Sequence, residues 1–267
     1  MRIFWQSFTD PATSGPYLAR LSAYLNAIAA PGTQVDVVGV SPSDRDFGRL
    51  AELRCAIRAI DNAIRAERDG YDVVVIGHFQ DPGLYELRAT LEIPVVGVGE
   101  STLLAAAQLG RRLGLVTLDP AFEIWHLEQA DRYGLGGRVT HVKGLALNPE
   151  DFNAAFDGDK AARARLFDLF GSCARPMIEG GADVIVPAGV LPGLLVATER
   201  GMRFGHVPVV NCASIGLKSA EMWGQLRALD GIGPSRGPAF ALSSPRAKAD
   251  FQALLAPDAT AWQPKRP

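Results

Sequence analysis

The sequence has little cysteine and no cysteine pattern. Its three cysteines, Cys55, Cys173 and Cys212, are odd in number and widely spaced. A disulfide framework needs paired cysteines, and the CxxC and HExxH spacings typical of zinc sites are missing too. The sequence therefore predicts no disulfides, no structural metal and a reducing, cytoplasmic location.

Long apolar runs and basic runs are also missing. No stretch approaches the roughly 18 apolar residues of a transmembrane helix. The opening MRIFWQS lacks the basic and apolar regions of a signal peptide, so no export signal is expected. The formal net charge is −2, and no basic run is longer than Arg111-Arg112. We expect a protein that binds neither membrane nor nucleic acid and acts on a small molecule.

What the sequence does contain is an internal repeat. DVVVIGH at residues 72–78 returns as DVIVPAG at residues 183–189, and Pro-Gly-Leu follows both. PVVGVGES from Pro94 returns as PVVNCAS from Pro208. The two offsets are similar, 111 (183 − 72) and 114 (208 − 94). A repeat of this length is too long for a solenoid and indicates two similar halves.

Short β-branched runs alternate with stretches of helical periodicity. Strands are predicted at residues 2–5, 34–40, 72–76, 95–98, 112–116, 138–142, 183–186 and 207–210. Helices are predicted at residues 17–30, 49–69, 101–108, 122–133, 161–179 and 214–229. This alternation is typical of parallel sheets covered on both faces. A closed eight-stranded barrel is the alternative, but the repeat does not give eight equal units.

We therefore expect an α/β protein with two pseudo-symmetric lobes. Each lobe is predicted to be a four-stranded parallel sheet with helices on both faces, and the active site lies in the cleft between them. Residues 1–97 and 211–267 form the first lobe, and residues 98–210 form the second. Ligands bind beyond the carboxyl ends of strands in such sheets. The candidates selected by this rule are Gln6, Ser7, Thr9, His78, Phe79, Glu100, Ser101, Thr117, Gly189, Val190, Asn211 and Cys212.

Several motifs follow one another through residues 1–225. They are the MRI opening, FQDPGLYELR, IPVVGVGES, LGRRLGLVT, GADVIV and VPVVN. In this order they resemble the aspartate/glutamate/hydantoin racemase superfamily, especially the hydantoin racemase branch that includes allantoin racemase. The resemblance implies two α/β lobes with the active site between them, and a homo-oligomer.

The resemblance also implies where the chemistry takes place. Family racemases use two cysteines, one per lobe, which remove a proton from one face of the α-carbon and return one to the other. Those positions fall on His78 and Gly189, and neither is a cysteine. Glycine cannot act as a base, so racemisation by two bases at these positions is excluded. A decarboxylase branch of the superfamily likewise works with one cysteine opposite a glycine.

One base still permits decarboxylation, elimination or tautomerisation. We therefore predict an isomerase or lyase, without cofactor or metal, that acts at a carbon next to a carboxylate or amide. His78 is the predicted acid/base, because imidazole titrates near neutral pH. Cys212 is the second candidate, although a free cysteine is more often a small buried hydrophobe.

The remaining candidates are assigned to substrate binding. The helix starts at Glu100-Ser101 and at Asn211 are interpreted as carboxylate sites, because free N–H groups there favour anions; simple N-caps are the alternative. The resemblance implies that Gln6 stands where the family usually has an asparagine that binds the substrate. Ser7, Thr9 and Thr117 are candidate hydroxyl donors or turn residues. Phe79, Gly189 and Val190 are predicted wall residues, with core packing the alternative for the aromatic ring.

Two further interpretations stay open. In the first, the protein is a true racemase of amino acids or hydantoins, and Cys212 or a water molecule supplies the second base. In the second, the chain has kept the cleft but lost catalysis, and it is a small-molecule binding protein. The loss of both family cysteines favours this last interpretation.

Overall fold

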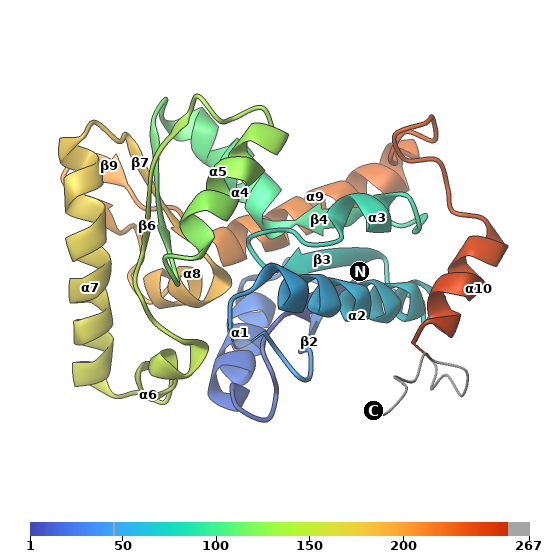
Figure 1. Ribbon diagram of the computed structural model, residues 1–267, viewed down its shortest axis with the longest axis horizontal. Coiled ribbons are helices and arrows are strands. Elements are labelled where there is room, and N and C mark those ends of the chain that lie inside the picture. Colours follow the sequence, from blue (N-terminus) through green and yellow to red (C-terminus); the bar gives the residue numbers. More distant parts are fainter. Residues whose placement is uncertain (45, 256–267) are drawn as a thin grey trace, which may run out of the picture.

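Two lobes lie side by side in the computed structural model, which describes residues 1–44 and 46–255 (Figure 1). Each lobe is built on a parallel β-sheet, so the predicted α/β architecture of two lobes is confirmed. The lobe boundaries at residues 97 and 210 stay a prediction. Residues 256–267, which we assigned to the first lobe, lie outside the described residues.

The first sheet has the strand order β2-β1-β3-β4 and is parallel throughout. Its strands are β1 (Arg2–Ser7), β2 (Gln34–Val38), β3 (Val73–Gly77) and β4 (Val95–Gly97). Alternate side chains point to opposite faces. Ile3 and Trp5 pack toward α1 (Gly15–Ile28) and α9 (Cys212–Asp230). Phe4 packs in a second core with α2 (Arg49–Arg68) and α3 (Leu84–Arg88).

The second sheet has the strand order β6-β5-β7 and is also parallel. Its strands are β5 (Leu113–Thr117), β6 (Val139–Gly144) and β7 (Val184–Ala188). The helices that pack against it are α4 (Val98–Leu109), α5 (Phe122–Arg132), α7 (Lys160–Glu179) and α8 (Val190–Val196). The short helices η1 (Pro149–Phe152) and α6 (Asn153–Phe156) lead into α7.

The second sheet differs from the prediction in its fourth strand. Residues 207–210 were predicted as a regular strand, but β9 (Val207–Pro208) pairs antiparallel with the short β8 (Arg203–Phe204). Val209 forms only an isolated parallel bridge to Ile185 among the described residues. Pro208 has no N–H to donate, which prevents a continuous ladder along β7.

The larger of the two hydrophobic cores runs through both lobes. It joins Ile3 and Trp5 of the first sheet to Leu113 and Val184 of the second. Helix α9 makes this continuity possible, because it packs against β3 and β4 and also against α4, α8 and β7. In Figure 1, α9 extends from beside the second sheet across the first lobe.

The C-terminal part of the described chain returns to the first lobe. Helix α10 (Pro245–Ala253), which we did not predict, follows a segment tied to α3. The Ser243 amide donates to the carbonyl of Ala89, and the Arg236 guanidinium donates to the carbonyls of Arg88 and Leu91. Helix α10 buries none of its residues, so no apolar stripe at helical spacing marks it in the sequence.

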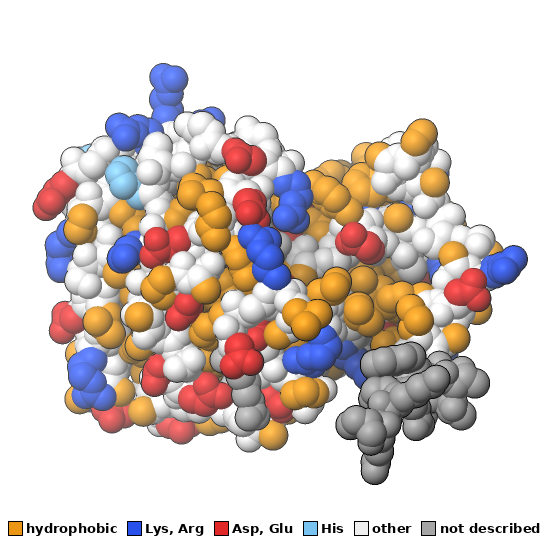
Figure 2. Space-filling view, viewed as in Figure 1, with side chains coloured by type: hydrophobic (Ala, Val, Ile, Leu, Met, Phe, Trp, Pro, Cys, Tyr) orange, Lys and Arg blue, Asp and Glu red, His pale blue; other side chains and the backbone are white. Residues whose placement is uncertain are grey.

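The surface agrees with the small net charge. On the face shown in Figure 2, acidic and basic side chains are interspersed rather than separated into patches of one sign. Within residues 1–44 and 46–255, no helix is long and apolar enough to cross a membrane.

Candidate active site

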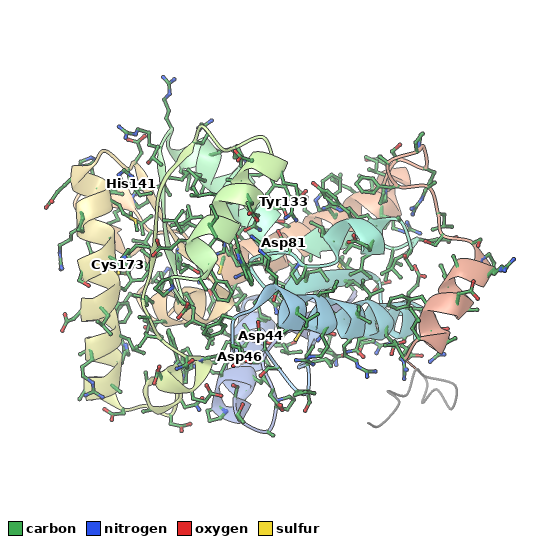
Figure 3. The ribbon with its side chains drawn as sticks, in the orientation of Figure 1. Asp44, Asp46, Asp81, Tyr133, His141 and Cys173 are labelled. Atoms are coloured by element: carbon green, nitrogen blue, oxygen red, sulfur yellow. The ribbon has the colours of Figure 1, made fainter. Side chains whose placement is uncertain are left out.

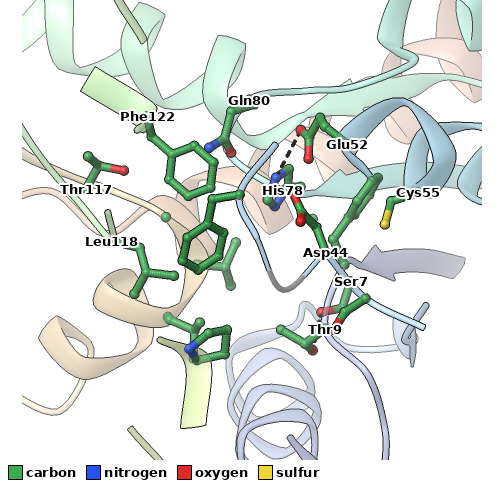
Figure 4. A pocket seen from close by; sticks show the side chains of 18 of the residues that line it. Ser7, Thr9, Asp44, Glu52, Cys55, His78, Gln80, Thr117, Leu118 and Phe122 are labelled. Carbon is green, nitrogen blue, oxygen red and sulfur yellow. Dashed lines mark hydrogen bonds and ion pairs between the residues drawn. The ribbon is translucent and has the colours of Figure 1, made fainter. Parts of the chain in front are cut away.

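One cavity lies where the central strands of the two sheets end. Its volume is about 700 Å³, counting the part that is open to solvent. Ser7 lines it at the end of β1 and Thr9 just beyond, His78 follows β3, Thr117 ends β5, and Gly189 follows β7. The two halves of the sequence repeat therefore contribute to one cavity (Figure 4), with His78 from the first and Gly189 from the second.

His78 is held in the cavity wall by two aromatic rings and a carboxylate. Its imidazole stacks on Phe8, with 4.7 Å between ring centroids and 17° between the planes. Phe122 of the second lobe meets it edge-on, at 6.5 Å between centroids. The Nε2 atom lies 3.1 Å from the Oε1 atom of Glu52. The side chain is 24% exposed, so one part of the ring remains accessible.

Charges around His78 change its protonation. Burial alone would lower the pKa of His78. The nearby carboxylates, Glu52 first and then Asp81 and Asp44, outweigh burial and raise this pKa above its ordinary value. The imidazole is therefore a stronger base than a free histidine, which suits proton abstraction at neutral pH.

Glu52 and Asp44 were not singled out by the sequence. Glu52 stands in the first turn of α2, where the helix dipole favours a carboxylate. Asp44 precedes that helix, and its carboxylate accepts hydrogen bonds from the amides of Asp46 and Gly48. Acidic residues at a helix start are common, so no signal in the sequence marked these two as parts of a cavity wall.

Hydroxyl groups gather at the end of β1. The hydroxyl oxygens of Ser7 and Thr9 are 3.1 Å apart, and the Tyr17 hydroxyl forms a hydrogen bond with Ser7. All three residues line the cavity. Burial raises the pKa of Tyr17, so its phenol stays protonated and can donate. This group is suited to stabilising negative charge on a substrate oxygen.

Gln6, in contrast, is fully occupied inside the first sheet. Its amide nitrogen donates to the backbone carbonyls of Ser7, Val38 and Gly39, and its oxygen accepts from the side chain of Asn62. The residue is completely buried. Substrate binding by Gln6 stays a prediction, and these contacts give it a structural role at the end of β1.

Gly189 puts no side chain on the wall of the second lobe. Its φ of 165° is extended backbone that any residue adopts. A Cβ atom placed there would lie 3.1 and 3.2 Å from two ring atoms of Pro192. The backbone thus accepts a side chain at this position after a small shift of the Pro192 ring. Val190, the first residue of α8, lines the cavity beside it.

Cys212 lies behind Gly189 rather than in the cavity wall. It is completely buried at the start of α9, and its thiol donates a hydrogen bond to the Gly189 carbonyl at 3.2 Å. Burial raises the pKa of Cys212 to about 12, so the thiol stays protonated at neutral pH. A catalytic role for Cys212 stays a prediction, and these surroundings weigh against it.

Thr117 connects the cavity wall to a buried polar network. Its hydroxyl oxygen lies 2.9 Å from the Nε2 atom of His126, and the Nδ1 atom of His126 lies 3.0 Å from the Oε1 atom of Gln129. The Gln129 amide nitrogen donates to the Phe79 carbonyl and, at 3.2 Å, to Asp81. Gln129 therefore presents its oxygen to His126, which must carry its proton on Nδ1 and accept from Thr117.

This network predicts a pH dependence of stability. Burial lowers the pKa of His126 to about 4, below the unfolded value of about 6.5. The unfolded chain binds the extra proton in this window, so the free energy of unfolding falls as pH drops from about 6.5 to about 4. The His126 contribution is on the order of 3 kcal/mol.

In denaturant titrations between pH 7 and 4, we expect the free energy of unfolding of the unmodified protein to fall, as pH drops, relative to that of a His126→Asn variant. Asp81, whose pKa is raised and whose effect on stability therefore has the opposite sign, is present in both proteins and cancels in the comparison. Equal slopes in the two proteins would contradict the assignment of a buried, neutral His126.

The start of α4 already holds a carboxylate from the protein itself. The amides of Gly99 and Glu100 donate to Asp81 at 2.9 and 2.6 Å, and the Tyr133 hydroxyl adds a third bond at 2.7 Å. Figure 3 shows Asp81 and Tyr133 close together. Burial raises the pKa of Asp81 to about 7, although these donors favour its ionised form.

This arrangement corrects the predicted start of the helix and weighs against the predicted carboxylate site there. The helix predicted from residue 101 begins at Val98. A Cβ on Gly99 would stand 1.9 Å from the Phe79 carbonyl oxygen and 2.8 Å from Asp81 Oδ2, so only glycine allows both groups to approach the helix start this closely. Because Asp81 occupies these amides, they are not free for a substrate carboxylate. Glu100 is ion-paired with Arg88, and Ser101 is half-buried inside the helix.

The second predicted anion site is closed in the same way. The Asn211 side chain accepts from the amides of Ala213 and Ser214 and caps α9, which is the alternative that we left open. Its amide nitrogen donates to the Tyr24 hydroxyl. Phe79 is 1% exposed and packs edge-on against His126, as the core-packing alternative predicts.

The structure thus divides the predicted site residues into two groups. Six line the cavity, namely Ser7, Thr9, His78, Thr117, Gly189 and Val190. The other six serve the surrounding fold, namely Gln6, Phe79, Glu100, Ser101, Asn211 and Cys212. Within the described part of the chain, no group of three or more His, Cys, Asp or Glu side chains is arranged to hold a metal ion.

The sequence of this chain is similar to those of known racemases. A profile of the family described as Asp/Glu/hydantoin racemase matches residues 8–220. The hydantoin racemase of Pseudomonas sp. (strain NS671) is 32% identical over 162 residues, which are 61% of this chain and 62% of that protein. The chain therefore spans less than two thirds of this relative. The hydantoin racemase of Rhizobium meliloti is 27% identical over 202 residues, 76% of this chain and 74% of the relative.

The same similarity extends to three dimensions. The allantoin racemase from Klebsiella pneumoniae superimposes with a TM-score of 0.72 at 26% sequence identity. The superposition covers 91% of this chain and 94% of that structure. The two-lobe arrangement therefore belongs to a fold that this racemase shares.

Proposed function

This chain belongs to the Asp/Glu/hydantoin racemase family, and on that basis we propose an enzyme that moves a proton on one face of a carbon next to a carbonyl. His78 is the acid/base. The observation that carries the proposal is the pairing of His78 with Glu52 in a cavity whose opposite lobe presents Gly189. One base opposite a glycine supports one-sided isomerase or lyase chemistry rather than racemisation by two bases.

The cavity lining favours an amide over a free carboxylate as the activating group. Among the described residues that line the cavity, the charged carboxylates are Asp44 and Glu52, and the basic group is His78. A substrate carboxylate would meet two negative charges and one imidazole. An uncharged ring amide avoids this repulsion, and hydantoin and allantoin, which the relatives' names carry, are molecules of that kind.

Apolar groups dominate the rest of the wall. Phe8, Phe47 and Phe122 contribute aromatic rings, and Leu118 and Leu191 add aliphatic surface. Such a lining suits a substrate with an apolar substituent on the reacting carbon. A hydantoin with a benzyl group at carbon 5 combines this substituent with an acidic carbon and two amide carbonyls, so we choose it as the probe.

The proposed step is a proton transfer. His78 takes the proton from the ring carbon, and the electron pair moves to the adjacent carbonyl oxygen as an enolate. The hydroxyls of Ser7, Thr9 and Tyr17 are the donors that stabilise this oxygen. His78 returns the proton, or a deuteron from solvent, to the same face.

The test is solvent exchange with each enantiomer of 5-benzylhydantoin in D₂O, followed by NMR and chiral chromatography. We expect deuterium to enter one enantiomer faster than the uncatalysed background while its handedness is retained. Equal conversion of both enantiomers would show a true racemase. Saturable binding without exchange above background would show a binding protein and overturn the proposal.

The same assay tests Cys212. We expect Cys212→Ala to leave kcat for exchange nearly unchanged, because the thiol is buried behind Gly189 and stays protonated. The free energy of unfolding falls by about 1 kcal/mol through the lost packing, as for most small core substitutions. A large loss of kcat with an unchanged unfolding transition would instead assign the second base to Cys212.

A further inference from the structure

We propose that Glu52 is the positioning residue of His78, and that it fixes Nδ1 as the nitrogen that exchanges protons with the substrate. The inference rests on the proposed function for its catalytic meaning, but the geometry and its first test do not need a substrate. Glu52 comes from α2, and His78 follows β3, so the pair joins two elements at the edge of the cavity (Figure 4).

Burial distinguishes the two imidazole nitrogens of His78 and indicates which one exchanges protons with a substrate. The Nε2 atom of His78 and the Oε1 atom of Glu52 are both shut off from solvent, and they face each other at 3.1 Å. Their alignment is that of an ion pair rather than of a well-formed hydrogen bond. Catalytic contacts are often imperfectly aligned before substrate binds. In the neutral imidazole, a proton on Nε2 lies beside the Glu52 carboxylate, and the lone pair is then on Nδ1.

The aromatic neighbours prevent the ring from exchanging its two nitrogens freely. Phe8 covers one face of the imidazole, and Phe122 contacts it edge-on from the second lobe. Within the described part of the chain, Nδ1 has no hydrogen-bonding partner and is not among the buried unpaired atoms. Nδ1 is therefore the nitrogen available to a molecule that enters the cavity.

Charge supports the same assignment. The ionisable groups that face His78 come from each element around it: Glu52 from α2, Asp44 from the preceding loop, Asp81 after β3, and His126 from α5. Among the groups that favour the charged imidazole, Glu52 has the largest influence. A carboxylate that holds one nitrogen and stabilises the imidazolium makes the other nitrogen a better base.

Helix α2 also offers a matched control. Asp61 is a carboxylate on the same helix, almost completely buried and paired at 2.8 Å with Arg65. It belongs to the packing of α2 and does not line the cavity. Asp61→Asn and Glu52→Gln each remove one carboxylate charge from helix α2. Only Glu52→Gln removes it beside His78, so Asp61→Asn controls for the loss of charge alone.

The first experiment is an NMR titration of the His78 imidazole without substrate. We expect Nε2 to carry the proton in the neutral form of the unmodified protein, as read from the nitrogen chemical shifts. In Glu52→Gln the titration midpoint moves to lower pH, and in Asp61→Asn it stays in place. A neutral form protonated on Nδ1, or an unchanged midpoint in Glu52→Gln, overturns the inference.

The second experiment measures deuterium exchange into 5-benzylhydantoin. We expect Glu52→Gln to lower kcat by roughly ten- to a hundredfold, part of the 10²- to 10⁴-fold that a positioned acid or base contributes. The acidic limb of the kcat/KM profile moves to lower pH with it, and Asp61→Asn moves neither. If titration agrees but the unmodified protein catalyses no exchange, the proposed function fails and the pairing stands. An unchanged kcat and pH profile in an active Glu52→Gln enzyme overturns the positioning role.

Discussion

Replacement of His78 by Ala lowers kcat for exchange at carbon 5 by about 10²- to 10⁴-fold, the contribution of a positioned acid or base. The substitution removes the imidazole that lies between Glu52 and the cavity. It also leaves the Glu52 carboxylate without its partner beside an empty space, which lowers stability. His78→Gln, which fills the space and retains a polar group, therefore belongs in the same series.

The measurement is the initial rate of deuterium incorporation from D₂O, with circular dichroism to verify that each variant is folded. His206→Ala is the matched control, because it also removes one imidazole, from an exposed loop position. We expect full activity in the control and a large loss in both His78 variants. Full activity in folded His78→Ala would remove His78 from the mechanism and leave the proposed function without its base.

Gly189→Cys is expected to add the missing chemistry on the opposite face. The new thiol would stand on the second lobe in the cavity that His78 lines from the first. The extended φ of 165° needs no glycine, and the Pro192 ring atoms at 3.1 and 3.2 Å leave room for Cβ after a small shift. With a base on each face, exchange is no longer confined to one enantiomer, and net inversion begins.

The readout is the rate at which one pure enantiomer of 5-benzylhydantoin becomes its mirror image. We expect this rate to rise by about 10²-fold or more over that of the unmodified protein, the lower range for one acid/base group. Gly189→Ser is the control, since it adds a side chain of similar size that is a much poorer base. Equal inversion rates in the two variants would mean that the size of the side chain at position 189, and not the basicity of the thiol, causes the inversion. That result would contradict the prediction.

Much of this geometry could be predicted because the sequence repeats. Apolar strands that end in polar residues predicted a shared edge, and His78, Thr117 and Gly189 do line one cavity. The two parallel sheets follow from the same alternation of strands and helices. Resemblance to a known family then indicated which two positions matter, although no strand or helix pattern carries that information.

Other features of the fold and the cavity could not be predicted from the sequence, for physical reasons. Glu52 and Tyr17 reach the cavity from helices, where a polar residue is usually exposed to water, so their types gave no warning. Asp81 is an internal partner for the start of α4, and sequence alone cannot tell an occupied helix start from a free one. The failure of the fourth strand in the second sheet depended on Pro208, which sits inside an otherwise favourable apolar run.

The position of α9 has a consequence for how the protein is made. Its residues pack against β3 and β4, but they follow those strands only after the whole second lobe has been synthesised. At about 5–20 residues per second, roughly ten seconds pass between the synthesis of β4 and the synthesis of α9. During this interval the face of the first sheet that α9 covers remains without that helix. Folding is therefore expected to finish late and as one unit, and the first sheet is the surface that a chaperone would protect meanwhile.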